Sequence, residues 1–170
     1  MAREEAVDLV DDRDRVVGAS TLRECLDRGL LHRAVAVVVS RKDGRVILQQ
    51  RSRRDAWHPG MWTLSCTGHV KKGESYADAA KRELEEEIGV KADLTMVKKY
   101  LLPPMKEGGL TEREWVTLFS ATSQARTTAD PVELEGVGEF TREEVRKMLD
   151  GGSMTPDAVI LMTEFLRGKT

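Results

Sequence analysis

Three glutamates in the middle of the chain could hold a metal ion together. Glu83, Glu86 and Glu87 stand at positions i, i+3 and i+4, so a helix would present their side chains on one face. Like charges at this spacing repel one another, which destabilises a helix that has no counter-charge beside them. Carboxylate oxygens, combined with the phosphate oxygens of a substrate, are the ligands that Mg²⁺ prefers in proteins. The spacing therefore suggests a magnesium site, and a solvated acidic face is the alternative.

The pattern around these glutamates is typical of a helix over residues 75–88. Apolar residues recur at helical spacing, and Gly89 follows as a C-cap. The apolar stripe consists of Ala77, Ala80, Leu84 and Ile88. This stripe lies next to the glutamate face rather than opposite it. We therefore expect the carboxylates at the edge of the buried side of the helix.

The stretch over residues 68–90 resembles the Nudix box. It consists of Gly68, then Glu74 after five residues, and then, after seven more, Arg82-Glu83-Leu84-Glu85-Glu86-Glu87-Ile88-Gly89-Val90. All nine specified positions of the box match. Seven fixed residues and two apolar ones coincide by chance about once in 10⁹ windows, because each residue type fills roughly 5–10% of positions. The resemblance is therefore very specific.

This resemblance implies a role for each matching residue. The metal, Mg²⁺ or Mn²⁺ in its place, would be bound by Glu83, Glu86, Glu87 and the backbone carbonyl of Gly68. Arg82 would orient Glu83, and Glu74 would brace the loop before the helix. Enzymes of this family hydrolyse a nucleoside diphosphate linked to another group, so a small phosphorylated substrate is expected.

The chemistry of a diphosphate agrees with such a site. Its own negative charge protects the linkage, and divalent cations neutralise that charge, position the phosphorus and lower the pKa of an attacking water. A nearby glutamate can then remove a proton from the water. We therefore expect Glu83, Glu86, Glu87 and Arg82 to be catalytic residues of a hydrolase.

A second resemblance extends over about residues 7–166. The order of short motifs is similar to type I isopentenyl diphosphate isomerase and its Nudix-hydrolase relatives: Leu31-His32-Arg33-Ala34, Gln50-Arg51-Ser52, Pro59-Gly60-Met61-Trp62 and Gly68-His69. That isomerase holds a metal with histidines and a pair of glutamates. The resemblance places on those ligand positions His32, His69, Glu112 and Glu114, with Glu114 also as the acid or base. Cys25 occupies a further histidine position. Cysteine is a soft ligand that would favour zinc or iron over magnesium, which leaves open a second, transition-metal site.

Several positions depart from the isomerase pattern. Where its mechanism needs a cysteine, the chain has Thr67, and Cys66 stands one residue earlier, where a strand would turn it to the opposite face. Asp157 follows Pro156 at the position of an expected tryptophan, and Asp55 stands where a diphosphate-binding lysine is expected. The glutamate helix is degraded in the isomerase but complete here. Because Thr67 stands in place of the cysteine, the proton donor for double-bond migration is missing.

These departures favour a Nudix hydrolase that cleaves a diphosphate linkage of a nucleoside diphosphate derivative or another organic pyrophosphate. Type I isopentenyl diphosphate isomerase is the alternative. A non-catalytic Nudix domain that senses a nucleotide is a second alternative, less favoured because a pure binding module does not need the intact glutamates.

Basic residues after the predicted strand over residues 46–50 could contact the substrate. Arg51, Arg53 and Arg54 form a cluster, and guanidinium groups bind phosphate bidentately. We expect Arg51 and Arg54 to bind substrate. Trp57 could either pack or stack on a base, and Glu139 is a candidate for a further acid beside the site.

Length and composition limit the other possibilities. A chain of 170 residues fits one domain, with an N-terminal hairpin and short helix in residues 1–31 and a core in residues 32–170. A formal net charge of −2 gives no field that would recruit a nucleic acid polymer. The longest apolar run, residues 34–39, is too short for a membrane. Two cysteines without a CxxC pair fit the cytoplasm, and the chain could be a monomer or a homodimer.

The elements that must position these residues alternate between strands and helices. Strands are expected over residues 33–40, 46–50, 62–66, 94–102 and 114–121, after a hairpin within residues 7–18. Helices are expected from Ser20 or Thr21 to Arg28 and over residues 75–88, 141–149 and 156–167, with an irregular loop over residues 103–109. The fold class is therefore α/β, a Nudix-type α/β/α sandwich with a mixed β-sheet between helices.

Overall fold

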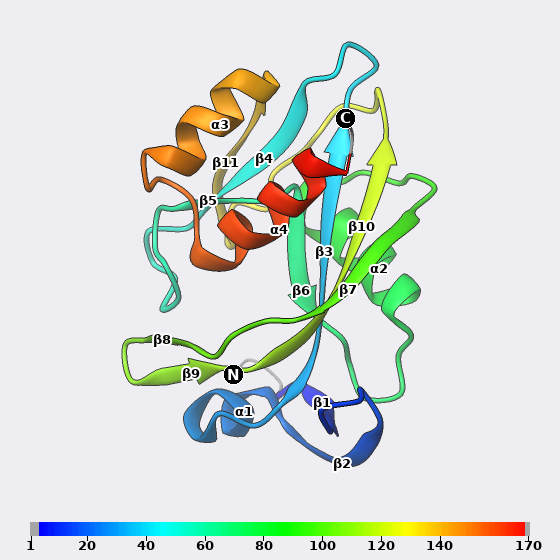
Figure 1. Cartoon of the computed structure of the whole chain (residues 1–170), viewed down its shortest axis with the longest axis vertical. Helices are drawn as coiled ribbons and strands as arrows, with labels where there is room; N and C mark the ends of the chain where they lie inside the picture. Colours follow the sequence, from blue (N-terminus) through cyan, green and yellow to red (C-terminus); the bar gives the residue numbers. More distant parts are fainter. Residues whose placement is uncertain (1–3, 169–170) are drawn as a thin grey trace.

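The computed structural model describes residues 4–168, and its centre is a mixed sheet built around β3 (His32–Ser40). β3 runs parallel to β10 (Glu114–Thr122) and antiparallel to β4 (Val46–Arg51). β11 (Leu134–Phe140) and β7 (Thr95–Leu101) are the outer strands, so the order is β11-β4-β3-β10-β7. Figure 1 shows this sheet in the middle of the molecule.

Helices cover both faces of the sheet (Figure 1). α2 (Tyr76–Ile88) packs on one face, and α3 (Arg142–Asp150) and α4 (Pro156–Arg167) pack on the other. β3 contributes to both cores: Val35, Val37 and Val39 are buried with α2, and Ala34, Ala36 and Val38 are buried with α4. The predicted α/β/α sandwich is thus confirmed. No helix within residues 4–168 combines the length and the apolar character that crossing a bilayer requires.

Two strands separate from one another and leave space for a site. β3 and β4 pair only at their hairpin end, where Ser40 lies opposite Val46. Beyond that point β6 (Cys66–His69) pairs with β3, and β5 (Trp62–Thr63) pairs with β4. The sheet therefore splits between β3 and β4, and the side chains of both branches face the gap.

The N-terminal part closes one end of the molecule. β1 (Ala6–Val10) and β2 (Val16–Thr21) form the expected hairpin, and α1 (Leu22–Arg28) follows. Thr21 caps α1 by accepting a hydrogen bond from the amide of Glu24, and Gly29 ends it in the left-handed conformation. The predicted hairpin and helix are confirmed.

Two predictions, for residues 103–109 and for residues 62–66, were wrong in detail. Residues 103–109 do not form an irregular loop, because β8 (Met105–Glu107) and β9 (Leu110–Glu112) form a hairpin. Gly108 and Gly109, both with positive φ, make the turn. Residues 62–66 do not form one strand either. Ser65 breaks it, donating its hydroxyl to the carbonyl of Ile47 and accepting from the amide of Val39.

Candidate active site

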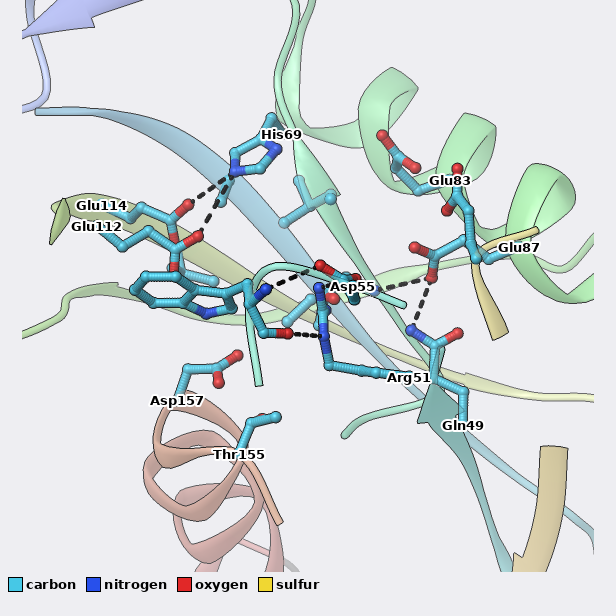
Figure 2. Close-up of a pocket in the computed structure, with 18 of the residues that line it drawn as sticks. Gln49, Arg51, Asp55, His69, Glu83, Glu87, Glu112, Glu114, Thr155 and Asp157 are labelled. Atoms are coloured by element: carbon cyan, nitrogen blue, oxygen red, sulfur yellow. Dashed lines mark hydrogen bonds and ion pairs between the residues drawn. The ribbon is translucent and has the colours of Figure 1, made fainter. Parts of the chain in front are cut away.

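A cavity of about 440 Å³ lies where β3 and β4 separate. Three groups of polar side chains face it: carboxylates of α2, a histidine and two glutamates from β6, β9 and β10, and residues at the start of α4. Figure 2 shows these groups around one space, with Arg51 and Asp55 between them. The volume is within the range of small-molecule sites.

α2 presents two of its glutamates to this cavity. Gly89 ends the helix in the left-handed conformation, as predicted, and Ser75, expected as its first residue, caps it instead. Leu84 and Ile88 are buried against the sheet, and this packing turns Glu83 and Glu87 toward the cavity wall. Glu83 and Glu87, two of the three predicted carboxylates, therefore lie at the edge of the buried face.

Glu87 is a nearly buried carboxyl that faces no cation. It is 7% exposed, and it accepts hydrogen bonds from Nε2 of Gln49 at 2.9 Å and from the amide of Thr67 at 3.2 Å. Burial, together with the charge of Glu83, raises the pKa of Glu87 to about 8. No Lys, Arg or His within residues 4–168 forms an ion pair with this carboxylate. A divalent cation would supply the missing positive charge.

Glu83 fits against the backbone of β6 because residue 68 is a glycine. A Cβ at Gly68 would lie 2.2 Å from the carboxyl carbon of Glu83. Burial raises the pKa of Glu83, although the guanidinium of Arg82 lowers it in part. Glu83, Glu87 and the backbone of Gly68 thus line one patch of the cavity, and this set of oxygen donors fits Mg²⁺ or Mn²⁺.

Arg82 connects three segments around this patch. It donates to both oxygens of Glu74, from Nε at 2.8 Å and from Nη2 at 2.9 Å. Its Nη1 contacts Glu83 at 2.6 Å, and its Nη2 donates to the carbonyl of His69 at 3.0 Å. The bonds to Glu74 and Glu83 raise the pKa of Arg82. The guanidinium therefore fixes Glu83 relative to β6 and the loop before α2.

The histidine–glutamate cluster consists of His32, His69, Glu112 and Glu114. Nε2 of His69 lies 3.2 Å from Oε1 of Glu114 and 3.8 Å from Oε1 of Glu112. Nε2 of His32 lies 3.4 Å from the same Glu114 oxygen. The sheet explains the grouping, because Glu114 and His32 are partners on adjacent parallel strands and His69 pairs with Ala34, two residues after His32.

One ring nitrogen of the cluster lacks a hydrogen-bond partner. Nδ1 of His32 lies 2.9 Å from the carbonyl of Leu30, and a carbonyl only accepts, so Nδ1 donates. Nε2 faces Glu114 at 3.4 Å, and within residues 4–168 this buried atom has no hydrogen-bond partner. His32, His69 and Glu114 each offer one ligand atom within 4.8 Å of the others. Two imidazoles and a carboxylate fit a transition metal.

The charges in this cluster shift one another strongly. Burial by itself would lower the pKa of His69, but hydrogen bonds to Glu112 and Glu114 raise it to about 10. Burial would raise the pKa of Glu114, but the adjacent imidazoles of His32 and His69 lower it. For Glu112, burial and the charge of Glu114 raise the pKa.

Some sequence-predicted residues lie elsewhere. Glu86 is 57% exposed, contacts Arg82 at 3.3 Å and does not line the cavity. Arg54 is exposed and lines a neighbouring groove, because the loop after β4 turns it away. Cys25 is buried in α1, outside the group of three ligand atoms. Glu139 pairs with Arg41 at 2.7 Å, remote from the cavity lining.

Arg51 does line the cavity. Its Nε donates to the carbonyl of Trp57 at 2.8 Å, and its Nη2 contacts Asp55 at 2.5 Å. Trp57 and Asp55 line the cavity as well, so the loop after β4 forms part of its wall.

Sequence reasoning missed two residues near the metal helix. Gln49 lies on β4 and holds Glu87, and the sequence does not distinguish it from Gln50, which follows it after the apolar run over residues 46–48. Glu133 lines the cavity from the loop before β11, where burial and the charges of Asp130 and Glu86 raise its pKa. No spacing pattern connects Glu133 to the Nudix box.

With this geometry in view, comparison with known proteins identifies the family. Residues 30–158 match the NUDIX domain, so the chain belongs to the Nudix family. It is 37% identical over 145 residues to an isopentenyl-diphosphate Delta-isomerase of Nocardia farcinica, covering 84% of this chain and 83% of that protein. It is 36% identical over 121 residues to an uncharacterized Nudix hydrolase of Pseudomonas aeruginosa, covering 71% and 69%.

A solved structure supports the same fold. The crystal structure of DR0079 from Deinococcus radiodurans superposes with a TM-score of 0.80 at 22% identity. The match covers 94% of this chain and 98% of that one. The predicted Nudix-type fold, in the branch near the isomerase, is therefore confirmed. The relatives include proteins named as isomerases and proteins named as Nudix hydrolases.

Proposed function

We propose that this protein is a Mg²⁺- or Mn²⁺-dependent hydrolase that cleaves a diphosphate linkage in a nucleoside diphosphate derivative or another small organic diphosphate. One observation carries the proposal. Glu83 and Glu87 face a cavity of suitable size with no cation paired to Glu87 among residues 4–168, beside a glycine that leaves room for them.

In the proposed reaction the residues of α2 and β6 would bind the cation and accept a proton. When bound, the cation would neutralise the diphosphate and lower the pKa of an attacking water. Glu83, Glu87 and the carbonyl of Gly68 would hold it from the cavity wall, and Glu86 would approach from the solvent side of α2. Glu87, held by the hydrogen bond from Gln49 beside the cation, would be placed to accept a proton from that water. Water adds to one phosphorus, the bridging P–O bond breaks, and a phosphate group leaves.

Arg51 would complete the phosphate site. It lines the cavity, and its bonds to Trp57 and Asp55 fix the plane of its guanidinium. A guanidinium held in one orientation can bind a phosphate with two parallel hydrogen bonds.

A turnover assay tests this function directly. The protein is incubated with Mg²⁺ and nucleoside diphosphates, dinucleoside polyphosphates, sugar nucleotides or isopentenyl diphosphate, and released phosphate or nucleotide is measured. Glu87→Gln should lower kcat by about 100-fold or more, as loss of a general base does. Glu85→Gln is the matched control, because Glu85 is exposed on the same helix and pairs only with Lys91 at 3.0 Å. Equal activity of both variants would refute the proposed role of Glu87.

The isomerase alternative rests on a separate observation. His69, Glu112 and Glu114 line the same cavity, and His32 is buried behind Glu114, a grouping that the resemblance to the isomerase implies. Against it, the position two residues before His69 is Thr67, and Cys66 points into the core beneath α2. Formation of dimethylallyl diphosphate from isopentenyl diphosphate, without phosphate release, would reverse the order of the two functions. Saturable binding without any turnover would support the nucleotide sensor.

A further inference from the structure

The start of α4 forms a distinct wall of the cavity. Thr155, Asp157 and Leu161 line it there, and Trp57 lines it from the loop after β4. In Figure 2, Asp157 and Thr155 lie on the opposite side of the space from Glu83 and Glu87. The cavity therefore has two ends of different origin, a metal-helix end and an α4 end.

Asp157 gives the α4 end the character of a hydrogen-bond acceptor. Its carboxyl is partly buried and forms no ion pair with any residue in the described range 4–168. The carboxyls of Glu112 and Glu114 add negative charge close to it. The hydroxyl of Thr155 lies beside it. This wall would thus attract groups that donate hydrogen bonds and disfavour a phosphate, although the charge of Arg51, which also reaches Asp157, offsets part of the repulsion.

The two ends together orient a substrate. In the proposed reaction the diphosphate lies beside Glu83, Glu87 and Arg51, where a cation and a guanidinium offset its charge. Asp157 disfavours the reverse orientation, because it would place like charges together. The organic group attached to the diphosphate must then extend toward α4 and Trp57.

We propose that Asp157 is a specificity-determining residue that selects an organic group bearing hydrogen-bond donors, such as the hydroxyls or the amino group of a nucleoside, and rejects an isoprenoid chain. This rests on the proposed function for the position of the diphosphate. An alkenyl chain at this wall would remove water from the carboxylate and add no donor to the contacts that Thr155 and the amide of Ala158 make with it, and reduced solvation of a charged group is unfavourable. The indole of Trp57 adds a flat apolar surface against which a base can pack.

Calorimetric binding with two non-hydrolysable ligands tests this proposal. Adenosine α,β-methylene diphosphate and isopentenyl methylenediphosphonate carry the same phosphorus groups but different organic groups. Both are titrated in Mg²⁺ into the wild-type protein, Asp157→Leu and Asp157→Asn. Asp150→Leu is the matched control, because Asp150 is exposed at the end of α3 and does not line the cavity.

The wild-type protein should bind the adenosine ligand at least about tenfold more tightly than the isopentenyl ligand, as expected for a hydrogen bond to a charged group. Asp157→Leu should reduce or invert this preference, and Asp157→Asn, which keeps an acceptor oxygen and the side-chain shape, should lie between. Asp150→Leu should match the wild type. An unchanged ratio in folded Asp157→Leu and Asp157→Asn, a wild-type preference for the isopentenyl ligand, or binding of neither ligand would overturn the proposal.

Two further ligands identify which group of the nucleoside donates the hydrogen bond to Asp157. The 2′-deoxyadenosine analogue lacks one hydroxyl, and the inosine analogue replaces the amino group by a carbonyl. Weaker binding of one of them by the wild type, but not by Asp157→Leu, shows which donor Asp157 contacts. Binding is measured independently of turnover, so a protein that binds as expected without hydrolysing diphosphates would refute the proposed function and leave this inference standing.

Discussion

Gly68 and Glu83 meet so closely that a side chain at residue 68 would occupy the position of the carboxylate: a Cβ there would lie 2.2 Å from the carboxyl carbon of Glu83. The requirement is one of space, because the φ of Gly68 lies outside the left-handed region. The glycine of the box therefore allows an acidic side chain of α2 to rest on the backbone of β6, at the wall of the cavity.

Gly68→Ala should consequently displace Glu83 and weaken metal binding more than it affects folding. We expect about a 10- to 100-fold loss of activity and a higher Mg²⁺ concentration for half-maximal activity, as when the support of a metal ligand is lost. Steady-state kinetics across a Mg²⁺ series provides the measurement. Gly136→Ala on β11 is the control, since a Cβ there would meet nothing within 4 Å. Wild-type Mg²⁺ dependence of Gly68→Ala would contradict the proposed site.

Arg82→Lys should lower activity although the positive charge remains. Lysine cannot reproduce the paired bonds to Glu74 together with the contact to Glu83, so Glu83 would lose its fixed orientation. We expect about a 10- to 100-fold decrease in kcat. In a double-mutant cycle, Glu74→Gln should add little once Arg82 is lysine, because both changes remove the same support. Independent, additive losses would show that Glu74 does not act through Arg82.

The cluster around His69 should bind a transition metal. Protein stripped with a chelator is dialysed against Zn²⁺ in the presence of excess Mg²⁺, which the carboxylates of α2 should bind, and bound zinc is measured by elemental analysis. His32→Ala and His69→Ala should each remove most of the bound metal, because each deletes one of the ligand atoms grouped with Glu114. His58→Ala is the control, since His58 pairs with Glu107 outside this group. Equal metal content in all three variants would place the metal elsewhere.

A helix, a strand or a site residue could be predicted here where neighbouring residues in the sequence carry the pattern that marks it. The valine-rich β3 and the helix α2 were predicted because side-chain periodicity reports burial directly. β11 was not predicted, since Gly136 and Gly138 remove the alternation that marks a strand. The same holds within the cavity. The box indicates Glu83 and Glu87, whereas Glu133 and Asp157 come to the same cavity only through tertiary packing.

Asp14 should make stability depend on acid pH. Its carboxyl contacts Nε of Arg33 at 2.6 Å, the hydroxyl of Tyr76 at 3.0 Å and the ammonium of Lys99, so it links the N-terminal hairpin to β3, α2 and β7. Burial acts to raise the pKa of Asp14, but these three contacts outweigh it and lower the pKa. A lowered pKa in the folded state gives stability that is present above the unfolded value, near 3.9, and is lost as the pH falls below it.

The test is Asp14→Asn, compared with the wild type by urea unfolding between pH 7 and pH 3. Asparagine tolerates the positive φ of 59° at this position, so the change removes charge rather than backbone fit. We expect the variant to be less stable by about 1–2 kcal/mol at pH 7, and the difference to shrink below about pH 4. Asp12→Asn, on the exposed turn beside it, should match the wild type throughout. A difference that does not change with pH would show that the charge of Asp14 is not the cause.

Cys66→Ser separates the two candidate chemistries. Successive residues of β6 point to opposite faces, so Thr67 lines the cavity while Cys66, 0% exposed, packs beneath α2 with Ala80 and Leu84. Burial, together with the nearby charges of Glu87 and Glu83, raises the pKa of its thiol, which disfavours a reactive thiolate. We expect the variant to keep diphosphate hydrolysis at about the wild-type rate and to lose about 1–3 kcal/mol of stability, because serine places a hydroxyl in an apolar core. Cys25→Ser, also buried but on α1, should behave alike. A folded Cys66→Ser protein without activity would mean that this thiol reaches the substrate, and the isomerase would then become the better description.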